Sequence, residues 1–202
     1  MSQPSSPEAV LDFWFGQPGP AAEVAARQRP LWFGKSAAND QQVTDRFVDT
    51  LTAAGAGQLD HWARTPRNQL ALIVVLDQFP HHIHRNQELS FAYDAQSLTL
   101  ALDMIQSGNA ARVAPIERVF VYLPLEHAES LVLQDQSVAL YTQLAAETHA
   151  AERPLFDGFL DYAVKHRDVV ARFGRFPHRN ELLGRPSSSE EIAFLQQPGS
   201  RF

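Results

Sequence analysis

Apolar residues recur every three or four positions along most of the chain, which is the period of an α-helix. Within residues 41–54, for example, Val43, Phe47 and Leu51 follow one another in steps of four. Residues 70–76 (LALIVVL) are apolar on every side, which predicts a buried and central helix. No stretch alternates apolar and polar residues over six positions, so the pattern predicts no β-strand.

Local capping residues divide this pattern into separate helices. Thr65 is suited to cap a helix that Pro66 opens, and Gly174 is suited to end another. Ser188 and Glu191 have the spacing of a capping box. We expect helices over 7–15, 21–29, 41–54, 66–79, 88–107, 115–123, 125–152, 153–173, 176–184 and 187–197. The predicted fold is a single all-α domain over residues 1–202, made of antiparallel helix hairpins.

Composition narrows the classes of protein that this chain represents. The 202 residues include 17 Lys and Arg against 23 Asp and Glu, a net charge of −6, and no cysteine. An acidic chain is poorly suited to nucleic acid or anionic membranes, and without cysteine it forms neither disulfides nor thiolate metal sites. The longest apolar run, 70–76, is far shorter than the roughly 20 residues that span a bilayer. No signal peptide is visible, so we expect a cytoplasmic protein with no membrane or nucleic-acid partner.

Ionisable side chains interrupt the apolar faces at four positions, which are Asp77, His127, Glu129 and His166. His127, for instance, has Leu123 and Leu131 one turn away on either side. A buried charge is costly unless it is paired, so we expect each of these groups to have a partner.

The candidate partners are arginines that follow helix-breaking residues. Residues 164–185 contain one lysine and five arginines against one aspartate and one glutamate. We expect the RFGRFPHRN segment, residues 172–180, to fold back over the ends of the helices that carry Asp77 and Glu129, with its arginines pairing with those carboxylates. Its short helix from Phe176 would also offer free N–H groups to an anion. The candidate site consists of Asp77, Arg85, His127, Glu129, His166, Arg175, His178 and Arg179.

Three functions are compatible with this cluster. It can bind a small anionic ligand or peptide, it can be the site of a hydrolase-like enzyme with His127 or His166 as general base, or it can be purely structural within a protein–protein scaffold. No phosphate-binding loop, GxSxG motif or HEXXH motif is present, so no cofactor is predicted and no catalytic residue is assigned.

Metal binding is not predicted either. His81, His82 and His84 lie close together after Pro80 but have no carboxylate beside them, so we expect surface or helix-capping residues. On a regular helix His127 and Glu129 would point about 200° apart and could not share one ion.

Several motifs resemble a known family. LALIVVLDQFPHHIHR (70–85), ERVFVYLPLEHAES (117–130) and the segment 166–195 are similar to the domain-of-unknown-function 924 family of mainly bacterial proteins. LWFGKS (31–36) and GQLDHWARTP (57–66) match its N-terminal half, so the resemblance covers nearly the whole chain. It implies a tetratricopeptide-like α–α superhelix of stacked hairpins, although no repeat period near 34 residues is visible, and it implies no established reaction.

The family's signature positions overlap the candidate site. The resemblance implies roles for Asp77, Gln78, Pro80, Arg85, Pro124, His127, Glu129, His166, Arg175, Pro177, His178, Arg179, Asn180 and Arg185. The usual family pattern after DQFP is Arg-Asn-Ile-Phe-Arg, whereas this chain has His81 at the first of those positions. Any role of that first arginine is therefore lost here.

Overall fold

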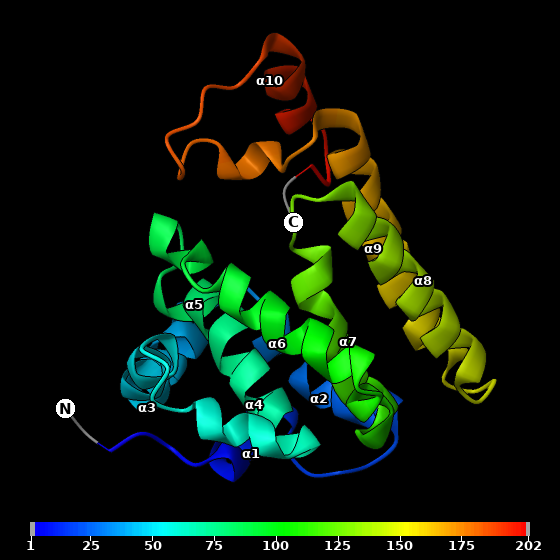
Figure 1. Cartoon of the computed structure of the whole chain (residues 1–202). Helices are drawn as coiled ribbons and strands as arrows, with labels where there is room; N and C mark the ends of the chain where they lie inside the picture. Colours follow the sequence, from blue (N-terminus) through cyan, green and yellow to red (C-terminus); the bar gives the residue numbers. More distant parts are fainter. Residues whose placement is uncertain (1–2, 201–202) are drawn as a thin grey trace.

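The computed structural model describes residues 3–200, which form helices and no β-strand (Figure 1). The all-α prediction is therefore confirmed, while the tetratricopeptide-like stacking and the single domain stay predictions. Within the described residues, no helix combines the length and the apolar character needed to cross a bilayer. The helices are α1 (Pro7–Phe15), α2 (Ala21–Trp32), α3 (Ala37–Gly55), α4 (Pro66–Asp77), α5 (Phe79–Ile83), α6 (Asp94–Gln106), α7 (Pro115–Glu126), α8 (Leu131–Glu147), α9 (Arg153–Phe173) and α10 (Ser189–Leu195), with short 3-10 helices η1 (Asp60–Arg64), η2 (Glu88–Phe91), η3 (Asn109–Arg112) and η4 (Pro177–Arg179).

Helix α4 lies at the centre of the fold, as its apolar sequence predicts. It packs against α1, α3, α6 and α7, and every side chain from Leu70 to Asp77 is buried. The Oγ1 atom of Thr65 accepts a hydrogen bond from the N–H of Asn68, so this residue caps the helix as expected. Because α4 is enclosed, the carboxylate of Asp77 at its end is removed from solvent.

Aromatic rings fix the surrounding helices to one another. The Trp14 ring of α1 contacts the rings of Trp32, Phe79 and Phe120, which lie on α2, α5 and α7. The indole N–H of Trp32 donates to the Trp14 carbonyl at 2.7 Å. Edge-to-face contacts of this kind stabilise a core beyond the area they bury. The cluster therefore fixes α1, α2, α5 and α7 to one another.

A separate apolar cluster holds the C-terminal segment, residues 174–200. Val169, Val170 and Phe176 form its buried centre, and Phe173 and Phe194 pack against it. In Figure 1, α8 and α9 run side by side as a hairpin, and the C-terminal segment lies at the end where α9 finishes and α8 begins. With so small an apolar centre, this segment depends on polar contacts for its position.

Some predicted boundaries are wrong. Helix α2 continues through Pro30 to Trp32, and Pro80 lies in the first turn of α5 instead of ending a helix. Most important for the site, the helix predicted over 125–152 is broken: α7 ends at Glu126, and α8 begins at Leu131. The turn over residues 127–130 therefore carries both His127 and Glu129.

Candidate functional site

A pocket of about 300 Å³ opens beside this turn. It is enclosed by the start of α6, the end of α7, the turn 127–130, the start of α8 and η4. Its lining residues are Asp94, Ala95, Leu98, Pro124, His127, Ala128, Glu129, Ser130, Leu133 and Arg179. Three of the predicted site residues thus share one pocket. They do so because the turn redirects side chains that a continuous helix would have pointed apart.

The imidazole of His127 is held from behind by Asp77. Its Nδ1 atom lies 3.0 Å from Asp77 Oδ1, and the amide Nε2 of Gln78 donates to the other carboxylate oxygen at 2.6 Å. Only 1% of the Asp77 side chain is exposed, against 17% for His127. No described residue forms a hydrogen bond with His127 Nε2. Because Nδ1 faces Asp77, the Nε2 atom is the one that faces the pocket.

The pair shifts the pKa of each partner. Burial raises the pKa of Asp77, but the charge and hydrogen bond of His127 outweigh it and leave that pKa below its ordinary value. Burial lowers the pKa of His127, and the Asp77 carboxylate outweighs this effect, so the pKa of His127 is raised. The expectation that an arginine holds Asp77 is wrong, since a histidine occupies that place.

Arg179 and Asp94 form the opposite side of the pocket. Arg179 Nη1 lies 3.2 Å from Asp94 Oδ2, and the guanidinium carbon lies 4.6 Å and 4.8 Å from the ring centres of Phe91 and Phe176. The Arg179 side chain is 8% exposed, and its Nε atom is shielded from solvent with no hydrogen-bond partner. Burial raises the pKa of Asp94 to about 6, although the charge of Arg179 opposes this shift. Burial likewise lowers the pKa of Arg179.

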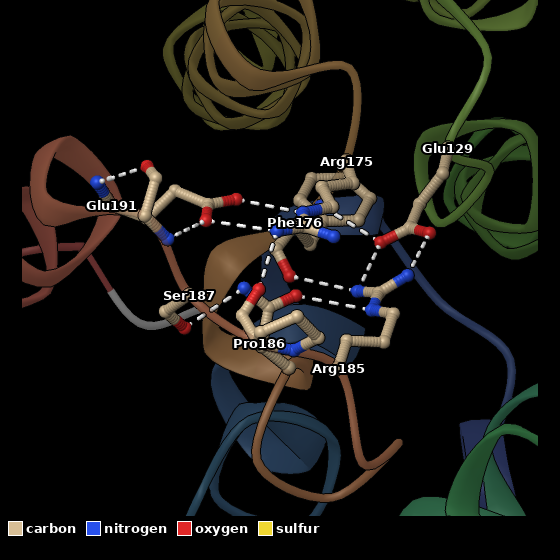
Figure 2. A network of polar contacts seen from close by, with 9 residues as sticks. Glu129, Arg175, Phe176, Arg185, Pro186, Ser187 and Glu191 are labelled. Atoms are coloured by element: carbon tan, nitrogen blue, oxygen red, sulfur yellow. Dashed lines mark hydrogen bonds and ion pairs between the residues drawn. The ribbon is translucent and has the colours of Figure 1, made fainter.

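Glu129 joins the turn to the C-terminal segment. Its two carboxylate oxygens accept hydrogen bonds from the fork of Arg185 at 2.6 Å and 2.8 Å, and from the Phe176 N–H at 2.8 Å (Figure 2). Arg185 also donates from Nη2 to the Phe176 carbonyl at 3.2 Å and from Nε to Asn180 at 3.0 Å. The C-terminal segment thus folds back onto Glu129, as we expected, and this contact brings Arg179 to the pocket.

Two of the candidate arginines lie elsewhere. Arg85 binds Asp40 of α3, with its Nη2 atom 2.6 Å from Asp40 Oδ1, and His82 binds the same oxygen at 2.9 Å. Arg175 binds Glu191 of α10 at 2.7 Å and 2.9 Å, on the far side of Phe176 from Glu129 in Figure 2. Neither arginine lines the pocket, because each pairs with a carboxylate outside it.

The remaining two candidates lie behind the pocket wall. The Nδ1 atom of His166 lies 3.1 Å from Glu126 Oε1 and 2.9 Å from the Tyr162 carbonyl. Burial lowers the pKa of His166 to about 3 and raises that of Glu126 to about 7. The ring of His178 lies 5.6 Å from that of Phe176. Neither histidine is among the residues that line the pocket.

We expected the histidines after Pro80 to be surface or helix-capping residues in a loop. His84 is indeed the C-cap of α5, but His81 and His82 lie within α5. His82 is 5% exposed, and the His81 ring lies 5.6 Å from that of His127. The Nε2 atom of His81 is shielded and has no hydrogen-bond partner, and burial lowers the pKa of His81 to about 3. No three His, Asp or Glu side chains among residues 3–200 are grouped to hold a metal ion.

Sequence reasoning missed Asp94 and Ser130 as pocket residues. Asp94 is the first residue of α6, where an acidic side chain is ordinary because it complements the helix dipole. Ser130 was hidden inside a helix predicted to be continuous. Arg185 was named only by the family resemblance, and its pairing with Glu129 was not predicted.

The fold and the site together define an all-helical protein with an imidazole and a guanidinium facing one small pocket. Residues 10–199 match the family described as bacterial proteins of unknown function (DUF924), and the chain belongs to that family. A solved structure of the protein of unknown function ATU0120 from Agrobacterium tumefaciens is similar, with 35% sequence identity and a TM-score of 0.78. The similarity covers 94% of this chain and 96% of the other. No curated protein matches the chain significantly.

Replacing Asp77 should lower the pKa of His127, which is raised in the wild-type protein. In Asp77→Asn the charge that raises the pKa of His127 is lost while its burial remains, so that pKa should fall below 6.5. Titration of the histidine side-chain resonances by NMR measures this directly. His82 is the control: its side chain contacts Asp40, its pKa is lowered chiefly by burial, and that pKa should not change. A His127 pKa that is the same in both proteins would contradict the assigned pairing.

The Glu129–Arg185 contact should stabilise the protein by about 1–2 kcal/mol at pH 7, since both side chains are about a quarter exposed. A double-mutant cycle of Glu129→Gln and Arg185→Met, followed by urea unfolding, measures this coupling. Burial raises the pKa of Glu129, but Arg185 and the Phe176 N–H lower it further, to a net value below 4.5. The coupling is therefore complete above about pH 4.5 and should disappear as the pH falls through the folded pKa. Coupling that does not weaken as the pH falls below 4.5 would argue against an ionic contact.

Proposed function

We propose that the pocket binds a small ligand that carries an anionic group. The proposal depends on one observation about Arg179. Its guanidinium is almost fully buried, yet some of its N–H groups have no acceptor among the described residues. Only its Nη1 atom is bonded, to Asp94. Buried donors without partners are costly, and a ligand or water that completes the donors of a pocket-lining arginine would remove this cost.

The rest of the pocket supports the same proposal. His127 presents Nε2 to it, with a raised pKa that favours the charged imidazolium. Leu98, Pro124 and Leu133 give it an apolar side, and the combination of an apolar wall with a few polar groups is typical of small-molecule sites. A peptide in place of a small molecule stays an alternative occupant. The scaffold alternative is less well supported, because a purely structural cluster would be sealed and fully paired.

The proposed ligand is expected to be a metabolite met in the cytoplasm, and we expect no membrane or nucleic-acid partner. The net charge of −6 favours a small ligand held by a few local cations over a polyanion that covers a large surface.

A thermal-shift screen of metabolites tests the proposal with two matched variants. Ala95 is exposed and lines the pocket, so Ala95→Trp should fill it without removing an ion pair. Ala146 is exposed near the other end of α8, and Ala146→Trp is the control. At about 100 times its Kd a ligand stabilises by about 2.7 kcal/mol, or roughly 5–10 °C here. This shift should be lost in Ala95→Trp and kept in Ala146→Trp.

The proposal fails if no compound raises the midpoint of the wild-type protein. It also fails if every stabilising compound acts equally on Ala95→Trp, because the binding site would then lie outside the pocket.

A second candidate function is an enzyme in which His127 is a general base. The Asp77–His127 pair favours it, because a carboxylate that fixes one imidazole nitrogen orients the other toward a substrate. Compounds that stabilise the protein should then be converted, with the product detected by mass spectrometry. His127→Gln should slow conversion by about 10²–10⁴-fold, which is far more than it weakens ligand-induced stabilisation. Absence of any product from every stabilising compound would exclude this candidate.

A further inference from the structure

The start of α8 opens into the same pocket. Ser130 caps this 17-residue helix, but its side chain makes no capping hydrogen bond. The N–H groups of Leu131, Val132 and Leu133 have no hydrogen-bond partner among the described residues, and the first helical bond is donated by Gln134. Ser130 and Leu133 both line the pocket. Free N–H groups and the positive end of the helix dipole attract an anion.

Arg179 reaches the same space from the other side, and it is independent of the helix. Its side chain is more than nine-tenths buried, and neither Nε nor Nη2 has a hydrogen-bond partner among the described residues. The Nε atom is shielded from solvent, whereas Nη2 is not among the shielded atoms. The open Nη2 donor of a residue that lines the pocket is the one available to an occupant.

Among residues 3–200, no carboxylate fills this place. Glu129, directly before the capping residue, turns its two oxygens to Arg185 and the Phe176 N–H, as Figure 2 shows. Asp94 binds Arg179 Nη1 through Oδ2. Within the part of the chain that the structure describes, the anion-binding groups at the start of α8 therefore have no internal anion.

The surroundings limit the charge and size of the occupant. Asp94 and Glu129 both line the pocket, and each would repel a dianion more strongly than a monoanion. A volume of about 300 Å³ equals that of about ten water molecules at roughly 30 Å³ each. These limits favour a short-chain or small aromatic acid over a phosphorylated metabolite.

We infer that the pocket takes a small monocarboxylate, whose carboxylate lies between the first N–H groups of α8 and Arg179. Its apolar part then lies along Leu98 and Pro124, next to the free Nε2 of His127. This inference rests on the proposed function and adds the chemical class of the ligand.

The test compares acids with their own amides at pH 7, followed in ¹H–¹⁵N NMR spectra of the full chain. Sodium butyrate and sodium benzoate are each titrated beside butyramide and benzamide, and inorganic phosphate is titrated separately. At least one acid should shift the amide resonances of residues 131–133 and the Arg179 Nε–H resonance. The matching amide should bind at least about tenfold more weakly, since it lacks the charge. Ala95→Trp should weaken binding of the acid about tenfold or more, and Ala146→Trp should leave it unchanged.

Four results would overturn the inference. If an amide binds as tightly as its acid, the charge of the ligand does not determine binding. If phosphate binds more tightly than either acid, the site prefers phosphate to a carboxylate. If the resonance shifts do not include residues 131–133, the acid binds elsewhere. If neither acid shifts any resonance, the ligand is not a small monocarboxylate. If library compounds still stabilise the protein in a manner sensitive to Ala95→Trp, the proposed function stands without this inference; if none does, both are lost.

Discussion

The bidentate contact between Glu129 and Arg185 is the interaction on which the site depends. It connects the turn between α7 and α8 to a C-terminal segment that is held by a small apolar cluster, in which three of the described residues are buried. Through the Phe176 N–H, the same carboxylate also fixes the residue that begins η4. Together with the ion pair of Arg179 and Asp94, this contact holds Arg179 over the pocket, so the shape of the site depends on ion pairs outside the main core.

Pairing of buried charges explains the inner side of the pocket. Asp77, at the end of the enclosed helix α4, keeps its charge only because His127 and Gln78 satisfy both of its oxygens. That requirement fixes which imidazole nitrogen points inward, and it leaves Nε2 for the pocket. The orientation of the reactive atom is thus a consequence of burying a carboxylate.

Much of the fold follows from local signals in the sequence. The uniformly apolar run at 70–76 indicated a central helix, and the capping residues Thr65 and Ser188 lie where their sequence context placed them. The break at residues 127–130 was missed because leucines continue the helical period across it, at 123, 125, 131 and 133. Periodicity reports which side chains are buried, and it does not detect a change in the direction of the chain.

The pairing of charges was harder to predict than their burial. The chain has 17 Lys and Arg and 23 Asp and Glu, and the sequence alone does not show which cation pairs with which carboxylate. Arg85 and Arg175 pair with Asp40 and Glu191, which lie in the first turns of α3 and α10 and which no pattern marked as partners of these arginines. Choosing among them requires the three-dimensional position of each helix end.

A contrast between two kinds of arginine carries the argument for function. The fork of Arg175 is satisfied by Glu191 and the Pro186 carbonyl, whereas Arg179 keeps shielded Nε without a partner. A buried polar group left unpaired costs about 1–3 kcal/mol, and a stable fold retains few of them. His81 adds a second such atom within ring contact of His127. Other shielded atoms without a partner among the described residues, such as Arg118 Nε and Trp14 Nε1, belong to residues that do not line the pocket. Arg179 differs from them because its side chain lines the pocket, where a ligand can reach the guanidinium.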